Sequence, residues 1–368
     1  MPEVRLTEVS KRFGRVEAID DVNLEISSGE YLCVLGPTGS GKTTLLRLIA
    51  GLLQPDEGDI LMDGKRMNEV PSEERDVAYM PQQYALFPHM TVLENVAFGP
   101  ISRGKRPDAA SATAHDILKM VRLDERADAL PSELSGGMQQ RVALARSLAS
   151  GVKLMLLDEP LAALDARLRV ELRYRLKNMV KSLGLTAVHV THDQREAMIV
   201  ADRLAVLRAG RAEQVGTPFH VYQRPDNLFV ANFVGDTNFL EGTVLKADPE
   251  ETSVELRGGL RVRVRETSFL AGERVVLVIR QELTSVEPRD WDSANALPGT
   301  IQAVRFLGDF IRVDVRLANG DGVGAKVPLT KVRAYPKAGE RVAVSFRPSD
   351  VSVYSTPPRG LVKEVEVA

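Results

Sequence analysis

The glycine-rich segment Gly36–Thr43 (GPTGSGKT) constrains this chain more than any other part of its sequence. It fits the pattern G-x-x-x-x-G-K-[ST], it follows the apolar run Tyr31–Leu35, and the helical pattern KTTLLRLIAGL begins at its end. Glycines in such a loop let backbone N–H groups converge on phosphate oxygens, and the helix N-terminus adds the positive end of its dipole. The sequence therefore predicts a strand, a phosphate-binding loop and a helix, in which Lys42 reaches the phosphates and Thr43 ligates Mg²⁺.

Further strand and helix patterns alternate up to about residue 235. The short apolar runs KLMLL and LTAVHVTH are typical of buried parallel strands, and residues 165–183 have the spacing of an amphipathic helix that stops at Gly184. Strands that alternate with helices predict an α/β domain with a mostly parallel sheet over residues 1–235. Residues of about 108–150 also have a helical pattern, which Asp128–Leu134 interrupts.

The pattern changes after residue 236 to short strands and turns, and it contains an internal repeat. The segment Ala271–Val275 (AGERV) recurs at Ala338–Val342, and matching openers Gly242–Val244 and Gly299–Ile301 stand ahead of the two copies. By this spacing the second copy carries a ten-residue insertion. The repeat predicts an all-β domain at residues 236–368, built as a tandem β-barrel module.

Composition excludes several classes of protein. The 368 residues hold 48 Lys and Arg against 50 Asp and Glu, so no overall basic field would attract nucleic acid. The single cysteine, Cys33, rules out an intrachain disulfide framework. No apolar run approaches the ~20 residues that span a bilayer, and the N-terminal sequence lacks a signal-peptide pattern. We therefore expect any membrane role to come through a partner.

Two adjacent acids end the KLMLL run. Asp158 and Glu159 stand where open α/β sheets bind ligands, at the carboxyl end of a strand. One acid in such a pair can hold Mg²⁺, and the other can polarise an attacking water. By itself a pair of acids after a strand is as often a solvated turn, so the prediction depends on the phosphate loop in the same chain.

These motifs together resemble a known family. Leu134–Gln139 (LSGGMQ) stands between the phosphate loop and the Asp-Glu pair, and His192 follows in VTHD. In this order the chain resembles the ATP-binding subunit of an ATP-binding-cassette (ABC) importer, with a C-terminal TOBE domain as in maltose, polyamine and iron importers. The resemblance implies an α/β P-loop NTPase domain with a helical subdomain at about residues 84–150, followed by an all-β domain of tandem OB-like (TOBE) type. It also implies ATPase activity.

The resemblance also implies a role for each matching residue. Glu159 is expected to be the general base, His192 to contact the γ-phosphate, Gln82 to sense it, and Lys42 to stabilise the phosphates. The expected Mg²⁺ ligands are Thr43, Gln82 and Asp158. The expected contacts to ATP come from Phe13, Gly36, Pro37, Thr38, Gly39, Ser40, Gly41, Lys42, Thr43, Thr44, Ser135, Gly136, Gly137, Met138 and Asp165.

Two positions depart from the family pattern. Met138 stands in the signature where many members have Gln, and Ala162 stands where Ser is common. Met138 lies beside the phosphate-facing residues, so the affinity for ATP across a dimer is expected to differ. Neither change removes an expected phosphate donor, metal ligand or base, so the resemblance still implies ATPase activity.

The family also implies partners. We expect a homodimer, or pairing with another ATPase subunit, because signature residues of this family act on ATP across a dimer. We expect two transmembrane permease subunits, which would contact Tyr84–His89 (YALFPH), and indirectly an extracytoplasmic solute-binding protein. The implied location is peripheral, on the cytoplasmic face of the cell membrane, and no nucleic-acid partner is expected.

The substrate is less constrained than the reaction. The segments NLFVANFVGDTNFLEGTV and FLGDFIRVDVRL are most similar to polyamine, iron or thiamine importer ATPases. A sugar (maltose-type) importer ATPase is the alternative, followed by a soluble ABC ATPase that acts on nucleic acid or the ribosome.

Overall fold

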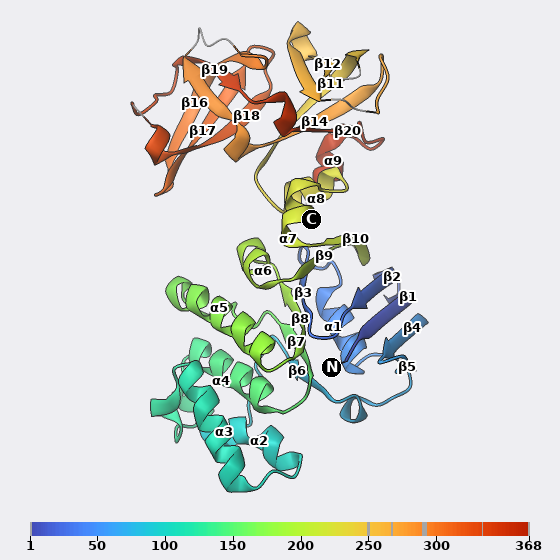
Figure 1. Cartoon of the computed structure of the whole chain (residues 1–368), viewed down its shortest axis with the longest axis vertical. Helices are drawn as coiled ribbons and strands as arrows, with labels where there is room; N and C mark the ends of the chain where they lie inside the picture. The colour runs from blue at the N-terminus through green and yellow to red at the C-terminus, as the bar shows by residue number, and fades with distance from the viewer. Residues whose placement is uncertain (1, 249–250, 266–267, 289–292, 333, 367–368) are drawn as a thin grey trace. The chain divides into compact units, whose positions relative to one another are not determined.

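The computed structural model describes residues 2–248, 251–265, 268–288, 293–332 and 334–366. Its contacts divide the chain into two compact units (Figure 1): unit 1 ends at Gln223 and unit 2 begins at Arg224. Helix α8 (Leu228–Phe233) lies between this division and the boundary at residue 235, which stays a prediction.

An antiparallel sheet in the order β2-β1-β4-β5 begins unit 1. Its strands are β1 (Val4–Phe13), β2 (Val16–Ile26), β4 (Glu57–Met62) and β5 (Lys65–Arg66). Val22, Leu24 and Ile26 alternate with exposed residues and are buried in the core, as period-2 patterning requires. One face of this sheet therefore covers the hydrophobic core of unit 1.

A six-stranded sheet forms the centre of unit 1, in the order β10-β9-β3-β8-β7-β6. Strands β9, β3, β8, β7 and β6 are parallel, and β10 pairs with β9 in the antiparallel sense. The predicted buried strands are confirmed, because every residue of β3, β7 and β8 is buried. The bounds are β3 (Tyr31–Leu35), β6 (Val77–Met80), β7 (Leu154–Asp158), β8 (Thr186–Thr191), β9 (Arg203–Arg208) and β10 (Arg211–Gly216).

Helices connect these strands, and α2, α3 and α4 lie together at one end of unit 1 (Figure 1). They are α1 (Lys42–Ala50), α2 (Val92–Ser102), α3 (Pro107–Met120), α4 (Gly136–Ala149), α5 (Ala166–Ser182), α6 (Gln194–Val200) and α7 (Pro218–Gln223), with 3₁₀ turns η1 (Ser72–Glu74), η2 (Asp124–Arg126) and η3 (Pro131–Glu133). Leu183, which the helical spacing places on the buried face of α5, is exposed. The helix ends one residue earlier, and Gly184 turns the chain with φ +63°.

Unit 2 contains two five-stranded antiparallel sheets, in the orders β13-β12-β11-β14-β20 and β15-β19-β16-β17-β18. The strands are β11 (Thr237–Ala247), β12 (Glu251–Leu256), β13 (Arg261–Arg265), β14 (Arg274–Arg280), β15 (Ser285–Pro288), β16 (Ala296–Phe306), β17 (Phe310–Leu317), β18 (Gly322–Pro328), β19 (Arg341–Ser345) and β20 (Val351–Ser355). The short helical segments are α8, η4 (Arg257–Gly259), η5 (Gln281–Leu283), η6 (Leu329–Lys331), η7 (Pro348–Asp350) and α9 (Leu361–Val365).

The repeated segments occupy equivalent places in the two sheets. Gly242 of β11 pairs with Val275 of β14, and Gly299 of β16 pairs with Val342 of β19. The last strand of each copy crosses over: β15 pairs with β19 of the second copy, and β20 pairs with β14 of the first. Each copy therefore completes the sheet of the other, and side chains from both sheets form one core.

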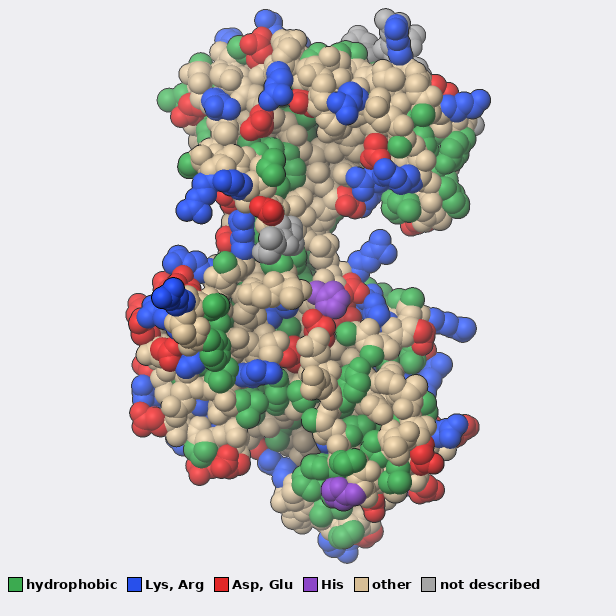
Figure 2. All heavy atoms as spheres, turned by 180° about the vertical axis from the view of Figure 1, so that it is seen from behind, with side chains coloured by type: hydrophobic (Ala, Val, Ile, Leu, Met, Phe, Trp, Pro, Cys, Tyr) green, Lys and Arg blue, Asp and Glu red, His purple; other side chains and the backbone are tan. Residues whose placement is uncertain are grey.

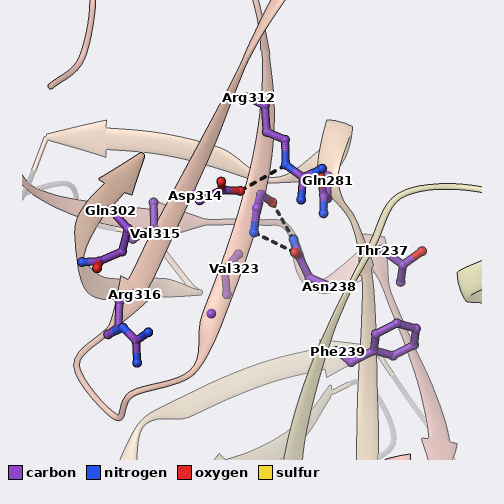
Figure 3. A pocket seen from close by; sticks show the side chains of 12 residues that line it. Thr237, Asn238, Phe239, Gln281, Gln302, Arg312, Asp314, Val315, Arg316 and Val323 are labelled. Atoms are coloured by element: carbon purple, nitrogen blue, oxygen red, sulfur yellow. Dashed lines mark hydrogen bonds and ion pairs between the residues drawn. The ribbon is translucent and has the colours of Figure 1, made fainter. Parts of the chain in front are cut away.

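A buried amide links the copies. Asn238 of β11 accepts from Gly324 N at 2.8 Å and donates to Gly324 O at 2.7 Å (Figure 3), and it also donates to Thr284 Oγ1 at 3.1 Å. A cavity of about 460 Å³ lies beside this link, bordered by Gln281, Arg312 and Arg316. Asn238 therefore joins the first copy to strand β18 of the second.

Candidate active site

The phosphate loop adopts the strand–loop–helix arrangement that its sequence predicts. It runs from the end of β3 to Lys42, the first residue of α1. Gly39 and Gly41 have φ of +82° and +100°, and a Cβ at Gly41 would lie 2.3 Å from Ala18 O. Only glycine meets both demands at Gly41, because a side chain there would be strained and would clash with backbone.

Lys42 and Thr43, the first two residues of α1, form hydrogen bonds with different parts of the site. Lys42 Nζ donates to the carbonyls of Gly36 at 2.9 Å and Pro37 at 2.7 Å, and burial lowers the pKa of its ammonium. Thr43 Oγ1 donates to Asp158 Oδ1 at 3.2 Å. Burial raises the pKa of Asp158, against the hydrogen bond from Thr43, which lowers it.

The carboxylate of Glu159 is held between two other predicted residues. Gln82 Nε2 donates to Glu159 Oε2 at 3.1 Å, and His192 Nδ1 lies 3.0 Å from Glu159 Oε1. The Glu159 side chain is 17% exposed and that of His192 is 63% exposed, so the pair opens to solvent on the His192 side. This arrangement can orient a carboxylate as a proton acceptor.

The strand order explains this meeting. Gln82 follows β6, Glu159 follows β7 and His192 follows β8, while the phosphate loop follows β3. These four strands are parallel neighbours in the order β3-β8-β7-β6, so their carboxyl ends share one edge. Glu159 lies between the other two because β7 lies between β6 and β8.

A cavity of about 470 Å³ lies at this edge. Nine residues predicted from the sequence line it: Thr38, Gly39, Gly41, Lys42, Thr43, Thr44, Gln82, Glu159 and His192. Val16 and Ala18 of β2 also line it and were not predicted. Apolar residues in an alternating strand give no signal for a binding wall, although the close approach of Gly41 to Ala18 explains their place.

Other residues expected at the site lie outside this cavity lining. Phe13 ends β1 with 47% of its surface exposed, and its cross-strand partner is the lining residue Val16. Gly36, Pro37 and Ser40 lie within the loop itself, and Ser40 Oγ is buried with no hydrogen-bond partner among the described residues. Asp158 lies beneath the cavity, against Thr43.

The signature residues form the start of another helix. Ser135 caps α4 by accepting from Met138 N at 3.3 Å, and Asp165 caps α5 by accepting from Leu168 N at 2.9 Å. Within the described part of the chain, neither these caps nor Gly136 and Gly137 line the cavity at the phosphate loop. A single copy of the chain therefore does not bring the signature to its own phosphate loop.

The metal prediction concerns a small set of oxygen donors. The hydroxyl of Thr43 and the carboxylate of Asp158 lie together beside the phosphate loop, and hard oxygen ligands of this kind fit Mg²⁺, which keeps several waters. Over the described ranges, no group of three or more His, Cys, Asp and Glu side chains gathers as a metal site. The donor set thus fits a cation that is also held by phosphates and water.

Comparisons with known proteins agree with both units. A family model described as ABC transporter matches residues 19–162, and one described as TOBE domain matches residues 273–353. The chain is 42% identical over 347 residues to the spermidine/putrescine import ATP-binding protein PotA of Rubrobacter xylanophilus, covering 93% of this chain and 91% of that protein. It is 45% identical over 349 residues to PotA of Methylococcus capsulatus, covering 92% and 89%.

A solved structure resembles the first part of the chain. It is the dimeric post-hydrolysis state of the ATP-binding cassette MJ0796 bound to ADP and Pi, 34% identical with a TM-score of 0.55, and the match covers 58% of this chain and 98% of that one. None of the helices in the described residues is long and apolar enough to cross a membrane. The chain belongs to the ATP-binding subunits of ABC importers, ATPases in which a cassette is followed by a TOBE domain.

Proposed function

We propose that this chain hydrolyses MgATP at the edge cavity of unit 1 and thereby energises polyamine uptake through separate membrane subunits. The observation that carries the reaction is the carboxylate of Glu159, hydrogen-bonded between Gln82 and His192 in a cavity shared with the phosphate loop. The polyamine assignment is supported by relatives named for spermidine/putrescine import, at 42% and 45% identity over most of the chain.

Binding of ATP would use the loop and the start of α1. Backbone N–H groups of the glycine-rich loop would donate to the phosphates, and the N-terminus of α1, which begins at Lys42, would add positive potential. Lys42 Nζ exchanges its bonds to the Gly36 and Pro37 carbonyls for phosphate oxygens. Phe13, exposed at the end of β1, offers an aromatic face to adenine.

Mg²⁺ would be held by Thr43 and Asp158, with Gln82 as a further ligand or a contact through water. When bound, the ion neutralises charge on the β- and γ-phosphates. Asp158 must be ionised for this role, although burial raises its pKa. The hydrogen bond from Thr43 favours the ionised form.

Hydrolysis would proceed by in-line attack of water on the γ-phosphorus. A bond forms between the water oxygen and phosphorus, the bond to the β-phosphate oxygen breaks, and ADP and phosphate leave. Glu159 accepts a proton from the attacking water, while Gln82 and His192 each hold one carboxylate oxygen of Glu159. His192, more exposed than Glu159, contacts the γ-phosphate.

The complete site would form across a homodimer, or across a pair with another ATPase subunit. The N-terminus of α4 at Ser135 is another anion site, and it lies outside the cavity of its own chain. The dimeric MJ0796 cassette supports this proposal. Mixing Lys42→Ala and Ser135→Arg subunits tests it: some mixed dimers regain ATPase activity if the sites are shared, and no activity returns if each site is complete in one chain.

Two transmembrane permease subunits would bind near Tyr84–His89, with a solute-binding protein acting on the outer side. Phe87 packs on Phe98 with ring centroids 4.5 Å apart, and Phe98 and Ile101 of α2 are more than 40% exposed. Figure 2 shows hydrophobic side chains gathered at the end of unit 1 that carries α2. An exposed apolar patch of this kind is suited to a partner, which would keep the chain on the cytoplasmic face of the membrane.

Uptake by intact cells tests the proposed function. In cells that lack the gene for this chain, accumulation of labelled spermidine or putrescine is expected to fall, and the wild-type gene is expected to restore it. The Glu159→Gln gene, which supplies a chain without the proposed base, is expected not to restore it. Unchanged polyamine uptake together with lost maltose uptake would instead assign the sugar alternative.

A further inference from the structure

Glu159 has a backbone conformation that residues with side chains rarely adopt. Its φ is +49°, in the left-handed region. For an L-residue other than glycine this region is sterically unfavourable, so surrounding contacts must hold the backbone in place. The direction of the Glu159 carboxylate depends on this backbone conformation.

Hydrogen bonds on both sides fix the Glu159 backbone. Its N–H donates to Val190 O of β8 at 2.9 Å. Its carbonyl accepts from the side-chain Nε2 of Gln140 at 3.0 Å, and from Ala162 N at 3.3 Å. Gln140 therefore supplies the shorter of the two bonds to this carbonyl.

Gln140 also binds the far side of the same loop. Its Oε1 accepts from Ala163 N at 3.0 Å, so one amide joins Glu159 to Ala163. Gln140 is 1% exposed. The amide orientation is determined by these partners, since its donor meets a carbonyl and its acceptor meets an N–H.

The helix that carries Gln140 packs closely on this loop. A Cβ on Gly137 of α4 would lie 3.1 Å from Ala163 O, tighter than an ordinary contact. Gly137 and Gln140 are three residues apart and share one face of α4. Over the described residues Gln140 does not line the cavity at the phosphate loop, so it reaches the chemistry only through other residues.

We propose that Gln140 is a positioning residue for ATP hydrolysis, which holds Glu159 in the left-handed conformation that directs its carboxylate between Gln82 and His192. The inference deepens the proposed function and rests on it, because it takes Glu159 as the proton acceptor. It also makes the placement of the base depend on α4, the helix that Ser135 caps.

The first test compares two buried amides in the full-length chain. Gln140→Met keeps the side-chain length and removes both hydrogen bonds, and its ATP turnover is expected to fall at least about tenfold while its Kd for ATP stays within about twofold. Asn68→Leu is the matched control. Asn68 also bridges two backbone groups, Ile60 N and Gly58 O, each at 2.9 Å, in the antiparallel sheet.

The control separates positioning from stability. Both variants are expected to lower the melting temperature, and only Gln140→Met is expected to lower turnover per folded protein. Equal turnover in the two variants would overturn the proposal. If Gln140→Met does not fold, Gln140→Glu replaces it, because a carboxylate keeps an acceptor for Ala163 N and turns an oxygen instead of a donor toward Glu159 O, which removes that hydrogen bond.

The second test asks whether Gln140 acts through Glu159. In a Glu159→Gln background, single-turnover hydrolysis is expected to change less than about twofold when Gln140→Met is added. The same tenfold loss in both backgrounds would overturn the proposal. Equal hydrolysis by wild type and Glu159→Gln would contradict the proposed function itself, and that comparison does not involve Gln140.

Discussion

Two groups of buried polar side chains, one in each unit, are arranged differently. In unit 1, polar groups gather at the carboxyl ends of the parallel strands, where Glu159 has a strained backbone and Ser40 Oγ is buried with no partner in the part of the chain that the structure describes. In unit 2, the buried amide of Asn238 has three hydrogen-bond partners, two of them on the backbone of Gly324. The first arrangement leaves groups available to a ligand, and the second uses them to join strands.

This contrast assigns different roles to the sheet edge of unit 1 and to the Asn238 link of unit 2. Strain and unpaired polar atoms lower stability and persist where chemistry needs them, whereas a fully paired buried amide specifies one arrangement of strands. We therefore expect substitutions at the edge of unit 1 to change turnover, and substitutions in unit 2 to change stability with little effect on ATP hydrolysis.

The largest effect is expected for Glu159→Gln. It removes the proton acceptor and leaves the phosphate and metal donors, so turnover is expected to fall about 10²–10⁴-fold with ATP binding retained. Phosphate release measures turnover. Size-exclusion chromatography detects the ATP-bound dimer, which is expected to accumulate in this variant. Near-native hydrolysis would contradict the role of Glu159.

Asn238→Leu is the corresponding change in unit 2. It leaves the N–H and carbonyl of Gly324 without this partner, which is expected to lower the free energy of unfolding of unit 2 by about 3 kcal/mol. Urea unfolding with a probe in unit 2 measures the loss, and ATP turnover at 25 °C is the control. A fall in ATP turnover without a loss of stability would contradict the different roles assigned to the two units.

The repeat in unit 2 predicts a matched pair of effects. A Cβ at Gly242 would lie 2.6 Å from Val254 Cγ1, and one at Gly299 would lie 2.5 Å from Val315 Cγ1. Gly242→Ala and Gly299→Ala are each expected to cost about 1–3 kcal/mol of stability, because the clashing valines are in the core. Very unequal losses in thermal unfolding would show that the two copies tolerate crowding differently.

Phe13→Ala is expected to act weakly on the site of unit 1. Loss of one aromatic face on adenine corresponds to about 1 kcal/mol, or about fivefold in the KM for ATP, with kcat unchanged. Steady-state ATPase kinetics measure both constants. A change confined to kcat would place Phe13 outside the adenine site.

The smallest effect is expected when unit 2 is removed and the affinity of unit 1 for ATP is measured. Fragments 1–223 and 1–236 both keep every residue of the phosphate-loop cavity, so equilibrium dialysis is expected to give a Kd within about twofold of the full chain. They differ in α8, where Leu228 and Ala231 pack on Val276 and Val278 of β14. If fragment 1–223 is more soluble and more stable than fragment 1–236, the result would favour the division at Gln223 over the predicted boundary at residue 235.

Local patterns predicted the elements that carry chemistry. The phosphate loop was recognisable because its glycines, Lys42 and Thr43 form one continuous segment, and β3, β7 and β8 were recognisable as short apolar runs. Val16 and Ala18 could not be recognised as cavity residues, since their role comes from the approach of β2 to Gly41. The end of α5 before Leu183 was also missed, because one residue more or less barely changes a helical pattern.

The sequence by itself determined the class of reaction, the phosphate loop and the repeat of unit 2, because each resides in a contiguous run or in a repeated one. Tertiary structure alone decided that β7 lies between β6 and β8, which brings Gln82 and His192 to the two oxygens of Glu159. It also decided that β15 and β20 exchange sheets and that Gln140 reaches the carbonyl of Glu159. These relations join residues far apart in the chain, and they follow from the order in which strands pair, which no local pattern encodes.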